Sequence, residues 1–216
     1  MSTPKNAVLA NEKKFSLSLN TSLQSHANDA ENKHELLILD GEVHRFDTML
    51  TLSFAARWSA SVQAGLVRNS AGDLDSLISN WHAAFGLPKG DRARFLQDQF
   101  LFIYQFGERG LALNQSVSGL GEIELSLAYQ LLSNAGIAAS AHAILSLPTG
   151  EQADLTGSSK ADAGLILALA SNRGSSLGWH ANLGAHWIGD DSLYKIETAD
   201  TFWAASIGLH WQANRK

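Results

Sequence analysis

Eight polar side chains in this sequence are of types that could carry chemistry, and they share one kind of placement. Each lies on the polar face of a segment in which apolar and polar residues alternate: Arg45, Asp47, Glu122, Glu124, His142, Asp162, His180 and His186. Carboxylates and imidazoles act as general acids and bases, and imidazole is also a common metal ligand. Acid–base catalysis and metal binding are therefore the first functions to consider.

Glu122 and Glu124 come nearest to an acid–base pair. Residues two apart project from the same face of a strand, so the two carboxylates would lie close together. Acid–base catalysis also needs a substrate pocket in which the two carboxylates have different pKa values. No neighbouring residues in the sequence indicate such a pocket. We expect these carboxylates to line a polar surface in an ion network with Arg45 and Asp47, and not to catalyse a reaction.

The histidine spacing argues against a metal site. His180 and His186 are six residues apart, roughly 20 Å along a strand, and cannot share one ion. Pairing of His186 with His142 on a neighbouring strand has no support from the spacing, and the chain has no cysteine to supply thiolates. We expect neither a metal nor another cofactor.

Two further kinds of catalytic or binding motif also find little support. A serine nucleophile at a barrel surface would need a histidine beside it, yet the outward positions are nearly all aliphatic or aromatic. The glycine-rich stretches "SGLGE" and "LTGSS" stand at strand starts and not between a strand and a helix, so they are not phosphate loops. We expect no enzyme, and a lipid-modifying barrel enzyme is the alternative.

The elements that position these residues are strands, because the dominant pattern has a period of two. In "KFSLSLNTSLQ" one face carries Phe15, Leu17, Leu19 and Leu23, and the other carries serine, asparagine and glutamine. The same alternation recurs in later segments, which gives about eight strands close to the ~9–11 residues that a tilted strand needs to cross a bilayer. The polar candidates would then all face one side of the sheet.

Connection lengths alternate as well. Short joins are expected at 55–57, 133–136 and 172–176, and long ones at 26–42, 68–119, 148–161 and 189–199. Short turns at one end and long loops at the other are typical of bacterial outer-membrane barrels. Aromatic residues near strand ends on the apolar face fit the girdles of such barrels: Trp58, Trp179, Trp187, Trp203 and Trp211. The prediction is one all-β domain over residues 1–216, an antiparallel up-and-down transmembrane-type barrel.

Alternation alone does not show which face of the sheet is in contact with water. A soluble barrel also alternates, with its apolar face inward. The polar face here is rich in Ser, Gly, Ala, His and Asn and poor in Lys and Glu, which suits a narrow lumen better than a solvated surface. The rival interpretation is a soluble or periplasmic binding module that encloses a hydrophobic ligand, and a structural envelope protein is a further one.

One segment departs from the strand pattern. Residues 69–119 are expected to form a long loop insertion with a helix near 74–85, capped by Asp73 and ended by Gly86. Its apolar side chains recur at helical spacing on one face: Leu74, Leu77, Ile78, Trp81 and Phe85. A helix this short needs a docking partner, which is the barrel rim or mouth, the bilayer interface, or another protein.

Composition sets limits on the partners. The formal charge of −5 argues against nucleic-acid binding. No run reaches the roughly 18 apolar residues of a transmembrane helix, and "MSTPKNAVLANEKKF" lacks the apolar core of a secretory signal. An exported protein would therefore be represented here without its signal peptide. The expected partners are outer-membrane lipid and a small solute or hydrophobic ligand.

Four segments carry a family resemblance: "LDGEVHRFDTMLTLSFAARWSASVQAGL", "SNWHAAFGLPKGDRARF", "SGLGEIELSLAYQLL" and "LPTGEQADLTGSSKADAGLILAL". In that order they resemble the bacterial family called domain of unknown function 3187, from about Phe15 to Trp211. The segment 147–162 also resembles a loop of outer-membrane barrels linked to phenol degradation.

The resemblance implies an exported Gram-negative outer-membrane barrel, and it implies no reaction. Family members usually carry a signal peptide and further strands after the region that matches Trp211. This chain is therefore either a narrow eight-stranded barrel or a truncated member. We expect an outer-membrane protein that serves as a narrow channel or transport component.

Overall fold

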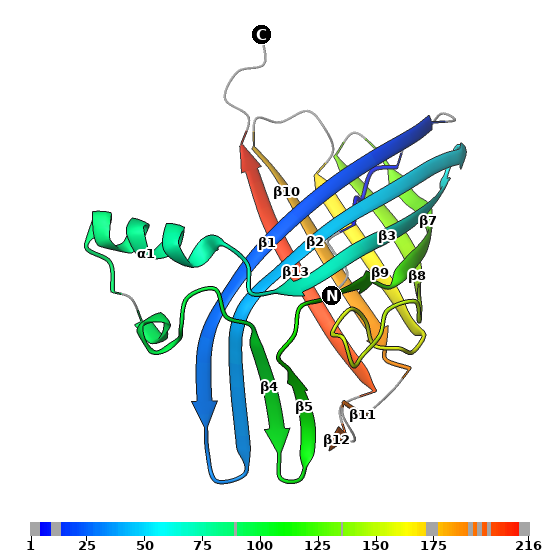
Figure 1. Ribbon diagram of the computed structural model, residues 1–216. Coiled ribbons are helices and arrows are strands. Elements are labelled where there is room, and N and C mark those ends of the chain that lie inside the picture. The colour runs from blue at the N-terminus through cyan, green and yellow to red at the C-terminus, as the bar shows by residue number, and fades with distance from the viewer. Residues whose placement is uncertain are drawn as a thin grey trace.

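The described part of the chain folds into one large antiparallel sheet with an α-helix beside it (Figure 1). The computed structural model describes residues 5–9, 14–88, 90–134, 136–171, 177–189, 192–193, 196–197 and 200–211. The elements are β1 (Lys14–Glu31), β2 (Glu35–Ala55), β3 (Trp58–Ser70), α1 (Leu74–Phe85), the 3₁₀ helix η1 (Gly90–Arg94), β4 (Leu101–Phe106), β5 (Arg109–Leu113), β6 (Val117–Leu120), β7 (Ile123–Ser133), β8 (Ile137–Leu147), β9 (Asp162–Ser171), β10 (Leu177–Trp187), β11 (Ser192–Leu193), β12 (Ile196–Glu197) and β13 (Thr201–Trp211).

Eight long strands form the body of the sheet, in the order β13-β10-β9-β8-β7-β3-β2-β1. Each is antiparallel to the next, as the up-and-down pattern predicts. The β4–β5 hairpin continues the sheet along the first part of β2, and β6 pairs with the last part of β3. Among the described residues, the sheet therefore has eleven strands, and β11 and β12 pair separately from it.

The sheet curls but does not close into a barrel, which corrects the expected fold class. Figure 1 shows β1, β2 and β3 on the near side, with β9, β10 and β13 behind them. Within the described residues, no hydrogen-bonded ladder joins β1 to β13, so these two strands are edges. Most residues of both are exposed, because each edge strand lacks a neighbour on one side.

The register keeps apolar residues on one face across the whole curled sheet. Leu17, Leu50, Val62, Leu125 and Leu145 are directly paired in sequence from β1 to β8. All five belong to the large apolar side chains that are exposed on the convex face. An apolar face that looks outward is the reverse of the arrangement in a soluble barrel.

The concave face is polar and contains little hydrocarbon. Its buried residues include Asp47, Ser126, Gln130, Ser140 and His142. The cluster of fully buried apolar residues is small, with Ala7 packed between Ala138 of β8 and Ala168 of β9. The interior is therefore held together by polar contacts and by strand pairing more than by apolar burial.

The connections differ in part from the expected ones. Residues 26–42, predicted as a long loop, form the extended β1–β2 hairpin with its turn at 32–34. The apolar run "ELLILD" at 35–40 extends β2 because it pairs with "LFIYQF" of β4 on one edge and with β1 on the other. The insertion at 69–119 likewise contains three strands besides the helix.

Other connections are confirmed. The joins at 55–57 and 133–136 are tight, and 148–161 is a long loop between β8 and β9. The join at 172–176 lies outside the described residues. The long join at 189–199 carries the β11–β12 hairpin. The α-helix has the predicted bounds. No helix among the described residues has the length and apolar character needed to span a membrane.

Candidate functional site

Six of the eight polar candidates line one cavity of about 700 Å³ in the long-loop half of the concave face. They are Arg45, Asp47, Glu122, Glu124, Asp162 and His186. They come from β2, β7, β9 and β10 and from the residue before β7, and the register places the five that belong to strands on the polar side of the sheet. The loop 148–161 adds Thr156, Gly157 and Ser158 to the wall.

Arg45 and Asp47 form an ion pair along β2. The Nε atom of Arg45 lies 2.9 Å from both carboxylate oxygens of Asp47. The Asp47 side chain is buried, and it lies over Gly65 of β3, where a Cβ atom would collide with it. The guanidinium therefore neutralises a carboxylate that the sheet removes from water.

The two glutamates do not face each other as a catalytic pair. Glu122 accepts hydrogen bonds from the backbone N (2.6 Å) and the hydroxyl of Ser158, so it ties the long loop to the start of β7. Glu124 instead accepts a hydrogen bond from the Lys5 ammonium at 2.6 Å. The charged network expected between the β2 pair and the two glutamates is thus replaced by separate pairs.

Three histidines on the concave face lie against glycines of neighbouring strands. His186 is paired with Gly164, His180 with Gly208, and His210 with Gly178. A Cβ atom added to any of these glycines would meet the imidazole, and the His186 ring also stacks on Phe202 at 4.7 Å. Each ring fills the space above a residue without a side chain, which is a packing role.

Asp162 and His180 lie at opposite ends of the sheet. The Asp162 carboxylate accepts a hydrogen bond from the backbone N of Gly189 at 2.9 Å, so it fixes the end of β10. His180 lies near the opposite, short-turn end of β10 and is exposed. Within the part of the chain that the structure describes, no group of three acidic, histidine or cysteine side chains could hold a metal ion.

The N-terminal residues 5–9 lie inside the curl of the sheet. The backbone N of Lys5 donates to Asn182 of β10 at 3.0 Å, and the Asn6 carbonyl accepts from the Ser140 hydroxyl at 2.9 Å. Gln130 of β7 binds the segment twice, with its amide N donating to the Ala7 carbonyl and its amide O accepting from the backbone N of Leu9, both at 2.7 Å.

His142 lies beneath the same segment. Its Nε2 atom is 2.9 Å from the Ser140 hydroxyl and 3.2 Å from the Asn6 carbonyl. Although serine and histidine are adjacent, the hydroxyl already donates to Asn6, and Ser140 is 0% exposed. This pair binds main chain and is covered, so a substrate cannot reach it in this arrangement.

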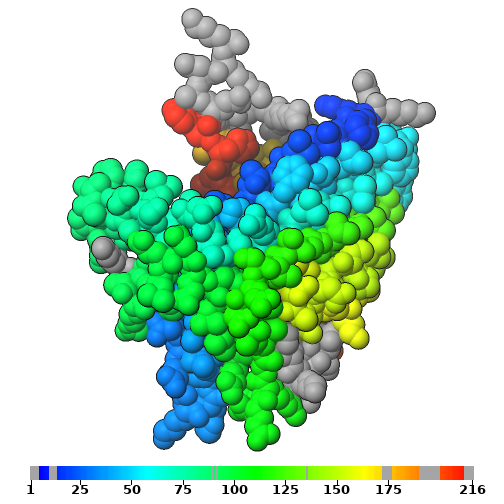
Figure 2. Space-filling model, in the orientation of Figure 1, coloured from blue at the N-terminus to red at the C-terminus, as the bar shows by residue number. Residues whose placement is uncertain are grey.

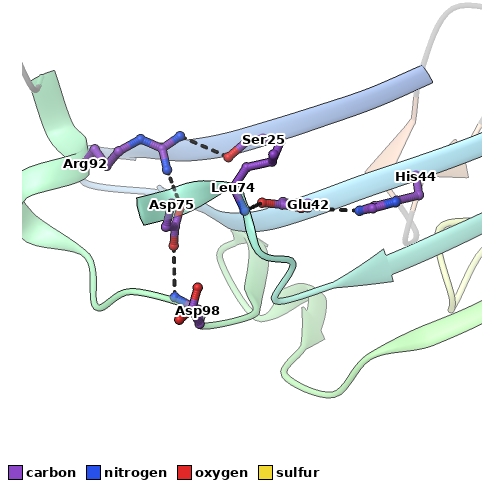
Figure 3. A network of polar contacts seen from close by, with 7 residues as sticks. All are labelled: Ser25, Glu42, His44, Leu74, Asp75, Arg92 and Asp98. Atoms are coloured by element: carbon purple, nitrogen blue, oxygen red, sulfur yellow. Dashed lines mark hydrogen bonds and ion pairs between the residues drawn. The ribbon is translucent and has the colours of Figure 1, made fainter. Parts of the chain in front are cut away.

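A second polar cluster, drawn in Figure 3, anchors the helix to the sheet. Glu42 of β2 is 1% exposed, and its Oε1 accepts a hydrogen bond from the backbone N of Leu74 at 2.6 Å. Its other oxygen lies 3.2 Å from Nε2 of His44. Asp73, the predicted cap, makes no side-chain capping bond among the described residues, because Glu42 takes that place.

The first turn of α1 and the 3₁₀ helix are joined by an ion pair between Asp75 and Arg92. Arg92 also donates to the hydroxyl of Ser25 on β1 at 3.0 Å, and Asp75 accepts from the backbone N of Asp98 at 2.9 Å. Asp29 of β1 pairs with Arg94 at 3.0 Å. The basic run after the helix therefore attaches the insertion to β1.

The predicted apolar face of α1 does not pack against the sheet. Leu77, Trp81 and Phe85 are 61%, 58% and 63% exposed, while Leu74 and Ile78 are half-buried. Figure 2 shows the helix standing out sideways from the sheet (upper left). The Trp81 and Phe85 rings contact each other at 4.5 Å. The helix thus lies beside the sheet and does not fold over its end.

Asp40 lies at the base of this insertion in an unusual setting. It is 2% exposed, and its Oδ2 atom has no hydrogen-bond partner among the described residues. It lines a small cavity together with Asp75 and Arg92. Burial, and next the negative charge of Asp75, raise the pKa of Asp40 to about 6, with Arg92 acting in the opposite direction.

Several of these residues could not be identified from the sequence. Lys5, Gln130, Ser140 and Asn182 act together only because an aperiodic segment lies across the polar face, and nothing in "PKNAVLA" indicates that placement. Glu42 lies at the end of the loop predicted at 26–42, whereas the structure places it within β2. The alternation around it, "LDGEVHRF", was the available signal that the strand extends further.

Comparison with known proteins identifies a family. The family described as "Protein of unknown function (DUF3187)" matches residues 6–216, nearly the whole chain. Neither the curated proteins nor the solved structures contain a match to this chain.

Proposed function

The chain belongs to the DUF3187 family, and from its geometry we propose that it is an outer-membrane protein of the β-barrel type that acts as a narrow channel or transport component. The observation that carries this proposal is the orientation of the two faces. Large apolar side chains are exposed on the convex face and polar side chains are buried on the concave face. Lipid is the solvent that suits an outward apolar face of this extent.

The aromatic residues support the same orientation. Trp58, Trp179 and Trp211 lie at the short-turn ends of their strands, and Trp187 and Trp203 lie at the long-loop ends. Aromatic rings prefer the two membrane–water interfaces, so rings at both ends of the strands fit a spanning sheet.

The helix adds a contact of the same kind. On β2 the exposed apolar side chains run from Phe46 to Phe54, and α1 is anchored just beyond them, at Glu42. Its exposed apolar face would therefore lie in the interface at the edge of the lipid-facing band. Of the three destinations considered for the helix, the interface fits its sideways position best.

A spanning sheet cannot leave open edges in lipid, because unpaired backbone groups have no water to bind there. The proposal therefore requires that β1 and β13 are paired in the membrane, either with each other or with strands of a second copy of the chain. Both strands are long and most of their residues are exposed, which leaves them available for pairing.

The concave face supports transport more than catalysis. The cavity of about 700 Å³ is lined by ion-paired and hydrogen-bonded side chains, which suit the passage or selection of a small polar solute. The rival binding module would enclose a hydrophobic ligand, and the polar concave face does not supply an apolar interior for one.

The test is refolding with and without detergent micelles, followed by circular dichroism and by gel mobility before and after boiling. The proposal predicts a β spectrum and a heat-dependent mobility shift only with micelles. A monodisperse β-rich protein in plain buffer would contradict it and favour the soluble module. Once folding in micelles is obtained, conductance in planar bilayers separates a channel from a purely structural envelope protein.

A further inference from the structure

We infer that the concave face is a binding site for peptide main chain, and that residues 5–9 of the chain occupy it as a releasable plug. The inference concerns inward side chains of three strands: Glu124 and Gln130 of β7, Ser140 and His142 of β8, and Asn182 of β10. It goes beyond the proposed function, and only its consequence for transport rests on that function.

The contacts are those of a bound ligand and not of a packed core. Most of them run from side chains of the sheet to backbone atoms of the segment, at Lys5, Asn6, Ala7 and Leu9. Contacts of this kind bind peptide main chain and are largely independent of its side chains. Gln130 is 3% exposed and reaches both Ala7 and Leu9, so it acts as a two-point clamp.

Charge fixes the position of the segment. The Lys5 ammonium lies 2.6 Å from Oε1 of Glu124, and the two side chains are 10% and 18% exposed. A charge-assisted hydrogen bond between groups this far from water is stronger than the neutral contacts around it. A cationic residue at the first bound position is therefore part of the specificity of the site.

Apolar contacts contribute little, so the segment can leave. Ala7 packs against Ala138 and Ala168, with Val8 and Ala170 at the margin. Burial of one methyl group and of part of Val8 and Leu9 is a small apolar contribution for a five-residue segment. The polar groups that bind the segment can bind water instead when it departs.

The segment also divides the interior. Lys5, Asn6, Val8 and Leu9 line a cavity of about 270 Å³ on the short-turn side, which also includes His142. Glu124 lines the larger cavity on the long-loop side. The Lys5–Glu124 pair thus stands at the boundary of the two cavities. Release of residues 5–9 would join them into one continuous polar space.

The first test uses the absence of cysteine in the chain. Val8→Cys places a single thiol in the segment, and Lys14→Cys places one at an exposed position as the matched control. With folded protein in micelles, a polar maleimide is expected to label Val8→Cys much more slowly than Lys14→Cys. Equal labelling rates would overturn the proposal, whatever the protein does in a membrane.

The second test weakens the site. Glu124→Ala removes the partner of Lys5, and Gln130→Ala removes the clamp. Each change is expected to speed the labelling of Val8→Cys by roughly tenfold, because loss of one strong hydrogen bond changes an equilibrium by about that factor. Lys14→Cys in the same backgrounds controls for general unfolding, and its rate is expected to stay constant. Unchanged labelling of Val8→Cys in both variants would overturn the proposal.

The third test measures the consequence for transport. In planar bilayers, a chain without residues 2–9 is expected to conduct more than the full chain. Addition of a synthetic peptide with the sequence of residues 5–9 is expected to reduce that conductance. The same peptide with glutamate in place of the lysine serves as the control and is expected to have no effect. Equal conductance of the two chains, with slow Val8→Cys labelling, would retain the binding site and overturn its role as a plug.

Discussion

The carboxylate of Glu42 caps a helix that follows it by 32 positions, since Oε1 accepts a hydrogen bond from the backbone N of Leu74 at 2.6 Å. A buried strand residue therefore does what the adjacent Asp73 was expected to do. The contact sets the direction in which α1 leaves the sheet, and the Asp75–Arg92 ion pair holds the next turn. The exposed apolar face of the helix is a consequence of these anchors.

Gly72→Ala is expected to disturb this anchor more than Gly86→Ala. Both glycines have positive φ values, +72° and +64°, so both alanines are strained. Only at Gly72 would the added Cβ collide with the Glu42 carboxylate. We expect Gly72→Ala to lower the free energy of unfolding by about 2–4 kcal/mol and Gly86→Ala by about 1 kcal/mol.

Urea unfolding followed by tryptophan fluorescence measures the two free energies, and amide exchange at 74–78 reports on the helix start. Faster exchange there is expected for Gly72→Ala alone. Equal effects of the two substitutions would contradict the capping role of Glu42.

Asp40→Asn is expected to change how stability depends on pH. The pKa of Asp40 is about 6 in the folded protein, above its ordinary value of 3.8, because burial and Asp75 disfavour the ionised form. The folded state thus binds the Asp40 proton more tightly than the unfolded state does. The contribution of protonated Asp40 to the free energy of unfolding is therefore lost as the pH rises from about 4 through 6. The amide is neutral at every pH and removes that loss.

The measurement is the free energy of unfolding of both proteins between pH 4 and pH 8. We expect Asp40→Asn to be more stable than the natural chain by about 1–2 kcal/mol at pH 8, with the difference disappearing toward pH 4. Asp29→Asn, which changes an exposed carboxylate paired with Arg94, is the control. A pH-independent difference for Asp40→Asn would contradict the assignment.

The Arg45–Asp47 pair is expected to behave as a coupled unit. Arg45→Gln leaves the buried Asp47 carboxylate without its cation and is expected to cost about 1–2 kcal/mol of stability. Asp47→Asn in the same chain is expected to restore part of that loss, because the remaining group is uncharged. A double-mutant cycle from urea unfolding measures the coupling, and strictly additive effects would show that the pair is not coupled.

Leu165→Lys separates a lipid-facing surface from a water-facing one. Leu165 is 54% exposed in the middle part of β9, on the convex face. A lysine in lipid at this depth is expected to cost about 2–4 kcal/mol, whereas in water it would cost little. Leu77→Lys on the equally exposed α1 is the control, with a smaller expected loss because the helix would lie in the interface. Folding efficiency in vesicles measures the effect of both substitutions. Unchanged folding of Leu165→Lys would indicate that the convex face is in water and would contradict the proposal.

Local pattern was sufficient to predict most of the strands and the helix. Alternation located the eight long strands, and the helical spacing from Leu74 together with Gly86 gave the bounds of α1. Both signals are periods of side-chain burial within a single element, which the sequence carries directly. Six of the polar candidates line the larger cavity for the same reason, since alternate residues of a strand face the same side of the sheet.

Contacts between distant segments could not be predicted in this way. The strand β4 exists because β2 extends to Glu35 and offers a free edge, and an apolar run such as "LFIYQF" reads equally well as part of a loop insertion. Glu124 was expected to take part in a network with Arg45, but Lys5 neutralises it from more than a hundred residues away. Pairing of this kind depends on how the sheet curls, and no local pattern encodes it.

The most direct test of the central claim compares adjacent residues on opposite faces of β7. Ser126→Cys places a spin label on the concave face and Leu127→Cys places one on the convex face, in a chain that has no other cysteine. In lipid vesicles, the account predicts that the label at 127 is accessible to oxygen and shielded from a water-soluble nickel reagent, while the label at 126 is not preferentially accessible to oxygen. Free access of the nickel reagent to position 127 would contradict an outward face in lipid.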